Sequence, residues 1–113
     1  EDSLSLFRLV NEPAGQAYLR EQGIADELIA RLPWIGISGA ANILSCIKFA
    51  KYYDLGANDL VLTVLTDSAE MYQSRLEEMS AVRGGAYQTL DAVVDYTRIL
   101  KGIKTDFVDE LTY

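Results

Sequence analysis

One short run of apolar residues constrains the fold of this chain more than any other feature. Residues 60–65 read LVLTVL, whereas most other apolar residues recur at the three- and four-residue spacing of amphipathic helices. A near-continuous apolar run is typical of a strand that is covered on both faces of a sheet. A lone strand lacks partners for its amide and carbonyl groups. We therefore expect its partner strands to come from polypeptide outside this sequence or from segments whose pattern does not identify them as strands.

Helical patterns surround the run on both sides, and the whole chain, 1–113, fits one domain or part of a larger one. Ser38 is a candidate N-cap for the longest helix, and Asp67 is one for the next, with Glu70 in the capping-box position. Residues 34–37 are expected to be extended. The predicted helices cover residues 4–10, 13–23, 26–32, 39–53, 68–79, 89–100 and 106–111. The expected fold class is α/β, with the strand at about 60–65 flanked by helices.

Charge and composition exclude several classes of function. The net charge of −7 argues against nucleic-acid partners and against anionic membrane surfaces. The absence of histidine excludes Ser-His-Asp and Cys-His catalysis and removes the commonest zinc ligand. The single cysteine, Cys46, fits a reducing cytoplasm and a thiol packed among apolar neighbours. No calcium-loop pattern accompanies the acidic residues at 77–78 and 106–110, which we interpret as solvated helix faces.

Two junctions carry the residues that chemistry could use. Each runs from apolar chain through small or polar residues into a predicted helix: IGISGAAN at 35–42 and LTDSAE at 65–70. Helix N-termini at such junctions offer free N–H groups to ligands. Gly36 and Gly39 allow another backbone or a flat ligand to approach closely. From spacing alone, Ser38 is most simply an ordinary N-cap, and a phosphate or nucleotide site at this helix start is an alternative.

The sequence around these junctions resembles a known enzyme family. GISGAANILSCIKFAKYY, followed by NDLVLTVLTDSAEMYQSRLEEM, is similar to the C-terminal part of the cysteine-synthase-like enzymes that depend on pyridoxal 5′-phosphate (PLP). These are the fold type II, tryptophan-synthase-β-like enzymes. Their pattern is a Gly-Ile-Ser-Ser-Gly-type turn, a long helix, an apolar strand and a Ser-Gly-Glu-Arg-Tyr-type turn. The likeness extends to LFRLVNEPAGQAYLREQG and YQTLDAVVDYTRILKGIKTDFVDELTY, nearly the whole chain.

The resemblance implies a fold, a cofactor and a set of site residues. The chain would be the helix-rich C-terminal portion of the large, PLP-binding domain, and Ser38 matches the serine whose hydroxyl meets the pyridine nitrogen. A hydroxyl is too weak an acid or base to hold that nitrogen protonated, which suits β-elimination or β-replacement on a small amino acid. The residues matched to the cofactor pocket are Gly36, Ser38 and Gly39 in the first turn and Thr66, Asp67 and Ser68 in the second.

The resemblance also implies that important parts lie elsewhere. The family's cofactor-binding lysine and glycine-rich phosphate loop precede these motifs and are not in this sequence, and Lys48 and Lys51 are expected on a solvated face. We therefore expect a segment that is inactive alone, completed by the missing N-terminal portion of the same enzyme and homodimeric when complete.

Three residues depart from the family pattern. Gly39 replaces a serine, Ala69 a glycine and Met71 an arginine. These changes disfavour plain cysteine synthase and leave the substrate open. The alternative function is that of a non-catalytic, acidic helical module that binds a protein partner.

Overall fold

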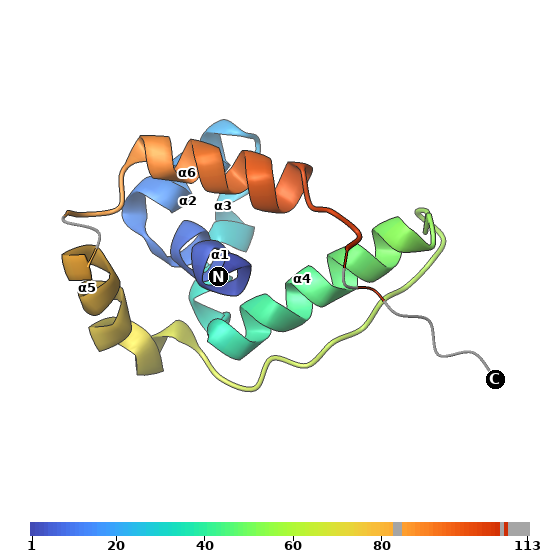
Figure 1. The fold of residues 1–113 in the computed structure, drawn as a ribbon, viewed down its shortest axis with the longest axis horizontal. Helices are drawn as coiled ribbons and strands as arrows, with labels where there is room; N and C mark the ends of the chain where they lie inside the picture. The colour runs from blue at the N-terminus through green and yellow to red at the C-terminus, as the bar shows by residue number, and fades with distance from the viewer. Residues whose placement is uncertain (83–84, 107, 109–113) are drawn as a thin grey trace.

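Helices form every regular element in the part of the chain that the computed structural model describes, which is residues 1–82, 85–106 and 108. Two short 3-10 turns, η1 and η2, interrupt the α-helices, and the π-helical segment η3 continues α6 (Figure 1). The elements in chain order are α1 (Asp2–Asn11), α2 (Pro13–Glu21), α3 (Asp26–Ile29), η1 (Leu32–Trp34), α4 (Ile37–Tyr52), η2 (Ala69–Tyr72), α5 (Gln73–Val82), α6 (Thr89–Asp95) and η3 (Tyr96–Lys101).

Helix α1 lies at the centre of the core. Leu6, Phe7 and Leu9 are almost completely buried, because α2, α4 and the α6–η3 helix all pack against α1. Figure 1 shows α1 between α6 on one side and the start of α4 on the other. Burying each such side chain contributes about 1.5–3 kcal/mol. Apolar residues on neighbouring turns of α1 therefore organise the other helices around it.

A buried cation ties the core together. Arg8 in α1 is 1% exposed, and its Nη2 atom lies 3.2 Å from Glu12 Oε1 and 3.1 Å from Ser80 Oγ. Its guanidinium also lies 4.9 Å from the centre of the Tyr87 ring. Burying an arginine is tolerated only when its charge is paired and its donors are satisfied. Arg8 thereby links α1 to α5 and to the segment that leads into α6.

The predicted strand at 60–65 is wrong, and with it the α/β fold class. The described residues contain no strand, and residues 60–68 run as non-helical chain alongside α4 (Figure 1). Leu60 and Leu62 are each 81% exposed, and Val64 is 69% exposed. An apolar run becomes a buried strand only when other strands pair with it. The described part of the chain offers none, so the run stays at the surface.

Most predicted helices are confirmed, with corrections at the starts of two of them, and the helix predicted at 26–32 ends earlier, because α3 stops at Ile29 and η1 follows it. Helix α4 begins at Ile37 and is preceded by Gly36 as N-cap, so the N-cap role of Ser38 is wrong. The capping box of Asp67 is also wrong, because Ser68 precedes η2 and the turn has no side-chain cap. The expected extended stretch at 34–37 narrows to Ile35 and Gly36. The predicted helix at 106–111 falls mostly outside the described residues.

Candidate functional site

The two junctions singled out in the sequence meet in space. The Gly36 N–H donates to the Asp67 carbonyl oxygen over 3.3 Å. The first turn of α4 therefore lies against residues 65–67, although more than twenty residues of chain separate them. We call residues 36–39 and 65–68 the two-turn site.

Two glycines make this approach possible. A Cβ atom at Gly36 would clash with the carboxylate of Asp67, and one at Gly39 would lie 2.9 Å from Leu65 Cδ2. Both glycines are buried. The sequence predicted that these glycines would admit either another backbone or a flat ligand. In this structure Gly36 admits the backbone of Asp67, while Gly39 accommodates the side chain of Leu65.

The carboxylate of Asp67 is turned inward. Its Oδ2 atom accepts a hydrogen bond from the Tyr72 hydroxyl, and its Oδ1 atom is buried without a hydrogen-bond partner among the described residues. The hydrogen bond to Asp67 raises the pKa of Tyr72 above its ordinary value. A negative charge beside the first turn of α4 is favourable, because the N–H groups of a helix start carry partial positive charge. Through the hydrogen bond from Tyr72, the last residue of η2, Asp67 links the junction to that turn.

The hydroxyl groups of the site differ from the Asp67 carboxylate in how far they are exposed. Ser38, the second residue of α4, is exposed, and its hydroxyl makes no hydrogen bond within the described residues. Thr66 is also exposed, and Ser68 is partly buried at the start of η2. The two-turn site therefore has an inner side, which the chain fills itself, and an outer side where Ser38 and Thr66 remain open.

A shallow hollow continues along the face of α4 that bears Ser38. Asn42, one helical turn further on, donates from Nδ2 to the Val64 carbonyl oxygen over 3.0 Å and so fastens the 60–66 segment to the helix. The hollow has a volume of about 310 Å³. Its lining residues are Asn42, Ser45, Cys46, Phe49, Val61 and Thr63. Cys46 is partly buried there rather than enclosed in a core.

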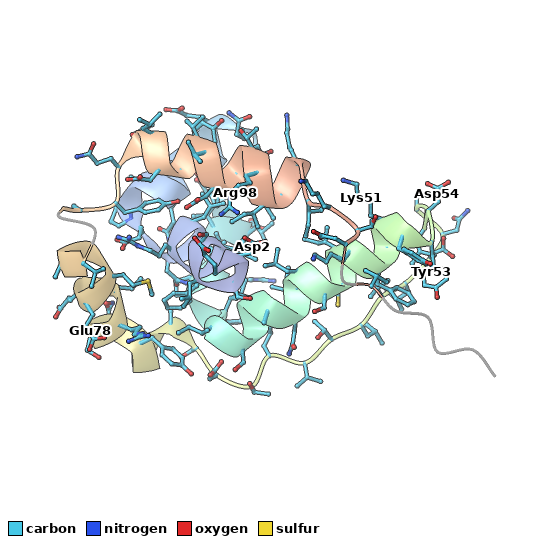
Figure 2. All side chains as sticks on the ribbon, viewed as in Figure 1. Asp2, Lys51, Tyr53, Asp54, Glu78 and Arg98 are labelled. Atoms are coloured by element: carbon cyan, nitrogen blue, oxygen red, sulfur yellow. The ribbon has the colours of Figure 1, made fainter. Side chains whose placement is uncertain are left out.

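Lys51 is exposed, as expected, and Lys48 is partly exposed, but both side chains also make tertiary contacts. Lys51 Nζ donates to the Ile103 carbonyl oxygen, and Lys48 Nζ donates to the carbonyl and carboxylate oxygens of Asp106. Figure 2 shows Lys51 toward the C-terminal end of α4. Lys48 lies ten residues beyond Ser38, about 15 Å along the helix axis. These lysines anchor the chain after η3 and do not approach Ser38.

Comparison of the chain with protein-family models, with curated proteins and with solved structures finds no match. Within the described ranges, no group of three or more histidine, cysteine or acidic residues is placed to hold a metal ion. None of the helices that the structure describes is long and apolar enough to cross a membrane.

Proposed function

We propose that this chain supplies the pyridine-nitrogen side of a PLP pocket, with the Ser38 hydroxyl as the group that meets the ring nitrogen. The observation that carries the proposal is the meeting of the two turns whose sequences resemble those of the PLP enzymes. Ser38 lies at the open side of that junction, and its hydroxyl has no hydrogen-bond partner among the residues that the structure describes. The residues fit one end of the cofactor, the end that needs a neutral hydrogen-bond partner.

The side chains around Ser38 support a neutral partner for the nitrogen. When bound, PLP supplies an electron sink for reactions at the α- and β-carbons of an amino acid. Ser38 would donate a hydrogen bond to the nitrogen without protonating it. The nearby carboxylate of Asp67 is engaged by Tyr72 and packed against Gly36, so it is not offered to the ring. This arrangement favours a lyase or synthase that performs β-elimination or β-replacement on a small amino acid.

Other polypeptide would complete the pocket. The phosphate and aldehyde ends of the cofactor need groups that the two-turn site does not contain. These groups would come from the N-terminal portion of the same enzyme, in a cytoplasmic homodimer. Gly36 and Gly39 hold the two turns together, while Thr66 and Ser68 border the open side. Their part in cofactor binding is to shape the junction that positions Ser38.

The position of Trp34 allows a direct test. It is the only tryptophan of the chain, is 65% exposed and lies four residues before Ser38. Pyridoxine 5′-phosphate keeps the ring and the phosphate of PLP but has no aldehyde, so it cannot form lysine adducts. Its binding should quench Trp34 fluorescence. Because a neutral hydrogen bond contributes about 1 kcal/mol, Ser38→Ala should weaken binding roughly fivefold.

The matched control is Ser45→Ala on the same helix, because the Ser45 hydroxyl already donates to the Ala41 carbonyl oxygen. Ser45→Ala should bind the ligand as the unmodified chain does. Equal affinities for Ser38→Ala and the unmodified chain would contradict the proposal. Complete competition by inorganic phosphate, with no effect of Ser38→Ala, would favour a simple anion site at the start of α4.

A second candidate function is that of a protein-interaction module. The observation that favours it is the exposed apolar run at 60–65, whose Val61 lines the same hollow as the exposed Phe49. Phe49 packs against Tyr53, which packs against Tyr52, and both tyrosines are exposed. Contiguous exposed apolar residues are typical of protein-interaction surfaces.

A further inference from the structure

Residues 60–66 have the side-chain pattern of a strand, although no strand pairs with them in the described part of the chain. Leu60, Leu62 and Val64 are strongly exposed, whereas Val61 and Thr63 line the hollow against α4. Alternate residues therefore face opposite ways, which is the two-residue period of an extended strand. One face of the segment rests on α4, and the other is an uncovered apolar row.

The backbone of this segment is also open. Within the described part of the chain, no amide N–H from Leu60 to Thr66 donates a hydrogen bond. The carbonyl group of Val64 accepts one, from Asn42. A row of unpaired amide and carbonyl groups on an extended apolar segment is the arrangement that accepts an added strand. Another extended polypeptide would form hydrogen bonds with the open backbone groups and would also cover the apolar row.

The charged residues around this segment favour one kind of partner strand over another. The segment itself is uncharged, but no lysine or arginine occurs between Lys51 and Arg75. That interval contains four acidic residues. Three of them, Asp54, Asp59 and Glu70, are exposed and place negative charge at both ends of the apolar run, while the carboxylate of Asp67 is engaged by Tyr72. A second copy of this chain would bring the same negative charges together, which is unfavourable. A strand with basic residues at its ends would instead be attracted.

We propose that residues 60–66 bind an extended segment of a different polypeptide by strand addition. The partner strand has apolar side chains at alternate positions and lysine or arginine residues at both ends. Such a strand would be the partner of the protein-interaction module, and its binding does not depend on the cofactor proposal.

The test uses two synthetic peptides with one alternating valine–threonine centre, flanked in one by lysines and in the other by glutamates. Fluorescence anisotropy of labelled peptides would report their binding to the whole chain. The lysine-flanked peptide should bind, and the glutamate-flanked peptide should bind at least about tenfold more weakly. Hydrogen exchange should show new protection of the amides of residues 60–66 only when the lysine-flanked peptide is present.

Two leucine variants separate this surface from general stickiness. Leu62→Asp puts a charge in the apolar row and should weaken peptide binding at least about tenfold. Leu90→Asp makes the same change at a residue of α6 that is 72% exposed, and it should leave binding unchanged. Circular dichroism would check that both variants fold.

The inference is overturned if both peptides bind equally or if Leu62→Asp and Leu90→Asp behave alike. A chain that is dimeric without peptide, with residues 60–66 already protected, would overturn it in favour of a second copy. The Trp34 titration does not depend on either peptide, so failure here is distinguishable from failure of the cofactor proposal.

Discussion

At the scale of single residues, the buried pair of Tyr87 and Asp95 is the polar contact with the clearest chemical consequence. Tyr87 is 7% exposed, and its hydroxyl donates to Asp95 Oδ2 over 2.8 Å. Burial, and then the hydrogen bond to Asp95, raises the pKa of Tyr87 well above its ordinary value. Both causes disfavour a phenolate, which would be poorly solvated and would face a carboxylate.

The stability of the fold should therefore decline at alkaline pH. Above about pH 10 an unfolded Tyr87 loses its proton while the folded residue keeps it. The unfolded state then binds fewer protons, and the free energy of unfolding falls by up to about 1.4 kcal/mol per pH unit. Tyr87→Phe should remove this part of the slope, and Tyr52→Phe, at a residue 42% exposed, should not. Urea unfolding across this pH range measures how steeply the free energy of unfolding falls with pH. Identical slopes for Tyr87→Phe and the unmodified chain would show that Tyr87 is not the cause.

At the scale of elements, the contact between the start of α4 and residues 65–67 is the joint on which the two-turn site depends. Gly36→Ala should destabilise the fold by about 1–3 kcal/mol, because the added methyl group overlaps the Asp67 carboxylate. Gly85→Ala is the control, since a Cβ there meets nothing within 4 Å. Chemical denaturation measures both.

A double-mutant cycle distinguishes this clash from the poorer N-cap that alanine makes. In an Asp67→Ala background, Gly36→Ala should cost less, because the group that it would meet is gone. An unchanged cost in that background would show that the glycine matters for the cap and not for the joint.

The elements also show which parts of the fold the sequence predicts. Pro13, Gly23 and Gly102 are local signals, and the helices that they bound are found where predicted. The 60–65 run failed because a strand depends on remote partners, which its own pattern cannot supply. The N-cap at position 38 failed for a similar reason, because the helix starts where a glycine is needed to admit Asp67.

The site was only partly predictable, because its geometry also depends on contacts between remote parts of the chain. The turns at 36–39 and 65–68 could be chosen from their small and polar residues, and the structure brings them together. Their inner and outer sides could not be told apart, because that depends on what packs against them. Asn42 lies within the first junction, but its role was not predicted, since an asparagine within a helical pattern gives no sign that it fastens a segment more than twenty residues away.

At the scale of the whole molecule, two kinds of surface lie side by side along α4. One is the open side of the two-turn site around Ser38, and the other is the apolar row of residues 60–66. A separate hollow, of about 250 Å³, could compete for an anionic ligand. It is lined by Asp2, Lys48, Arg98, Gly102, Ile103, Lys104 and Asp106. Arg98 and Asp2 form an ion pair there, and Figure 2 shows the two side by side.

We propose that a pyridine-type cofactor lies against the open side of the two-turn site. The most direct test of its binding there is a titration with pyridoxine 5′-phosphate, followed through the backbone amide signals of the chain by NMR. We expect shifts concentrated at residues 37–42 and 66–68, and their loss in Ser38→Ala. Shifts confined to the neighbourhood of Lys48, Arg98 and Lys104, or no shifts at 37–42, would contradict it.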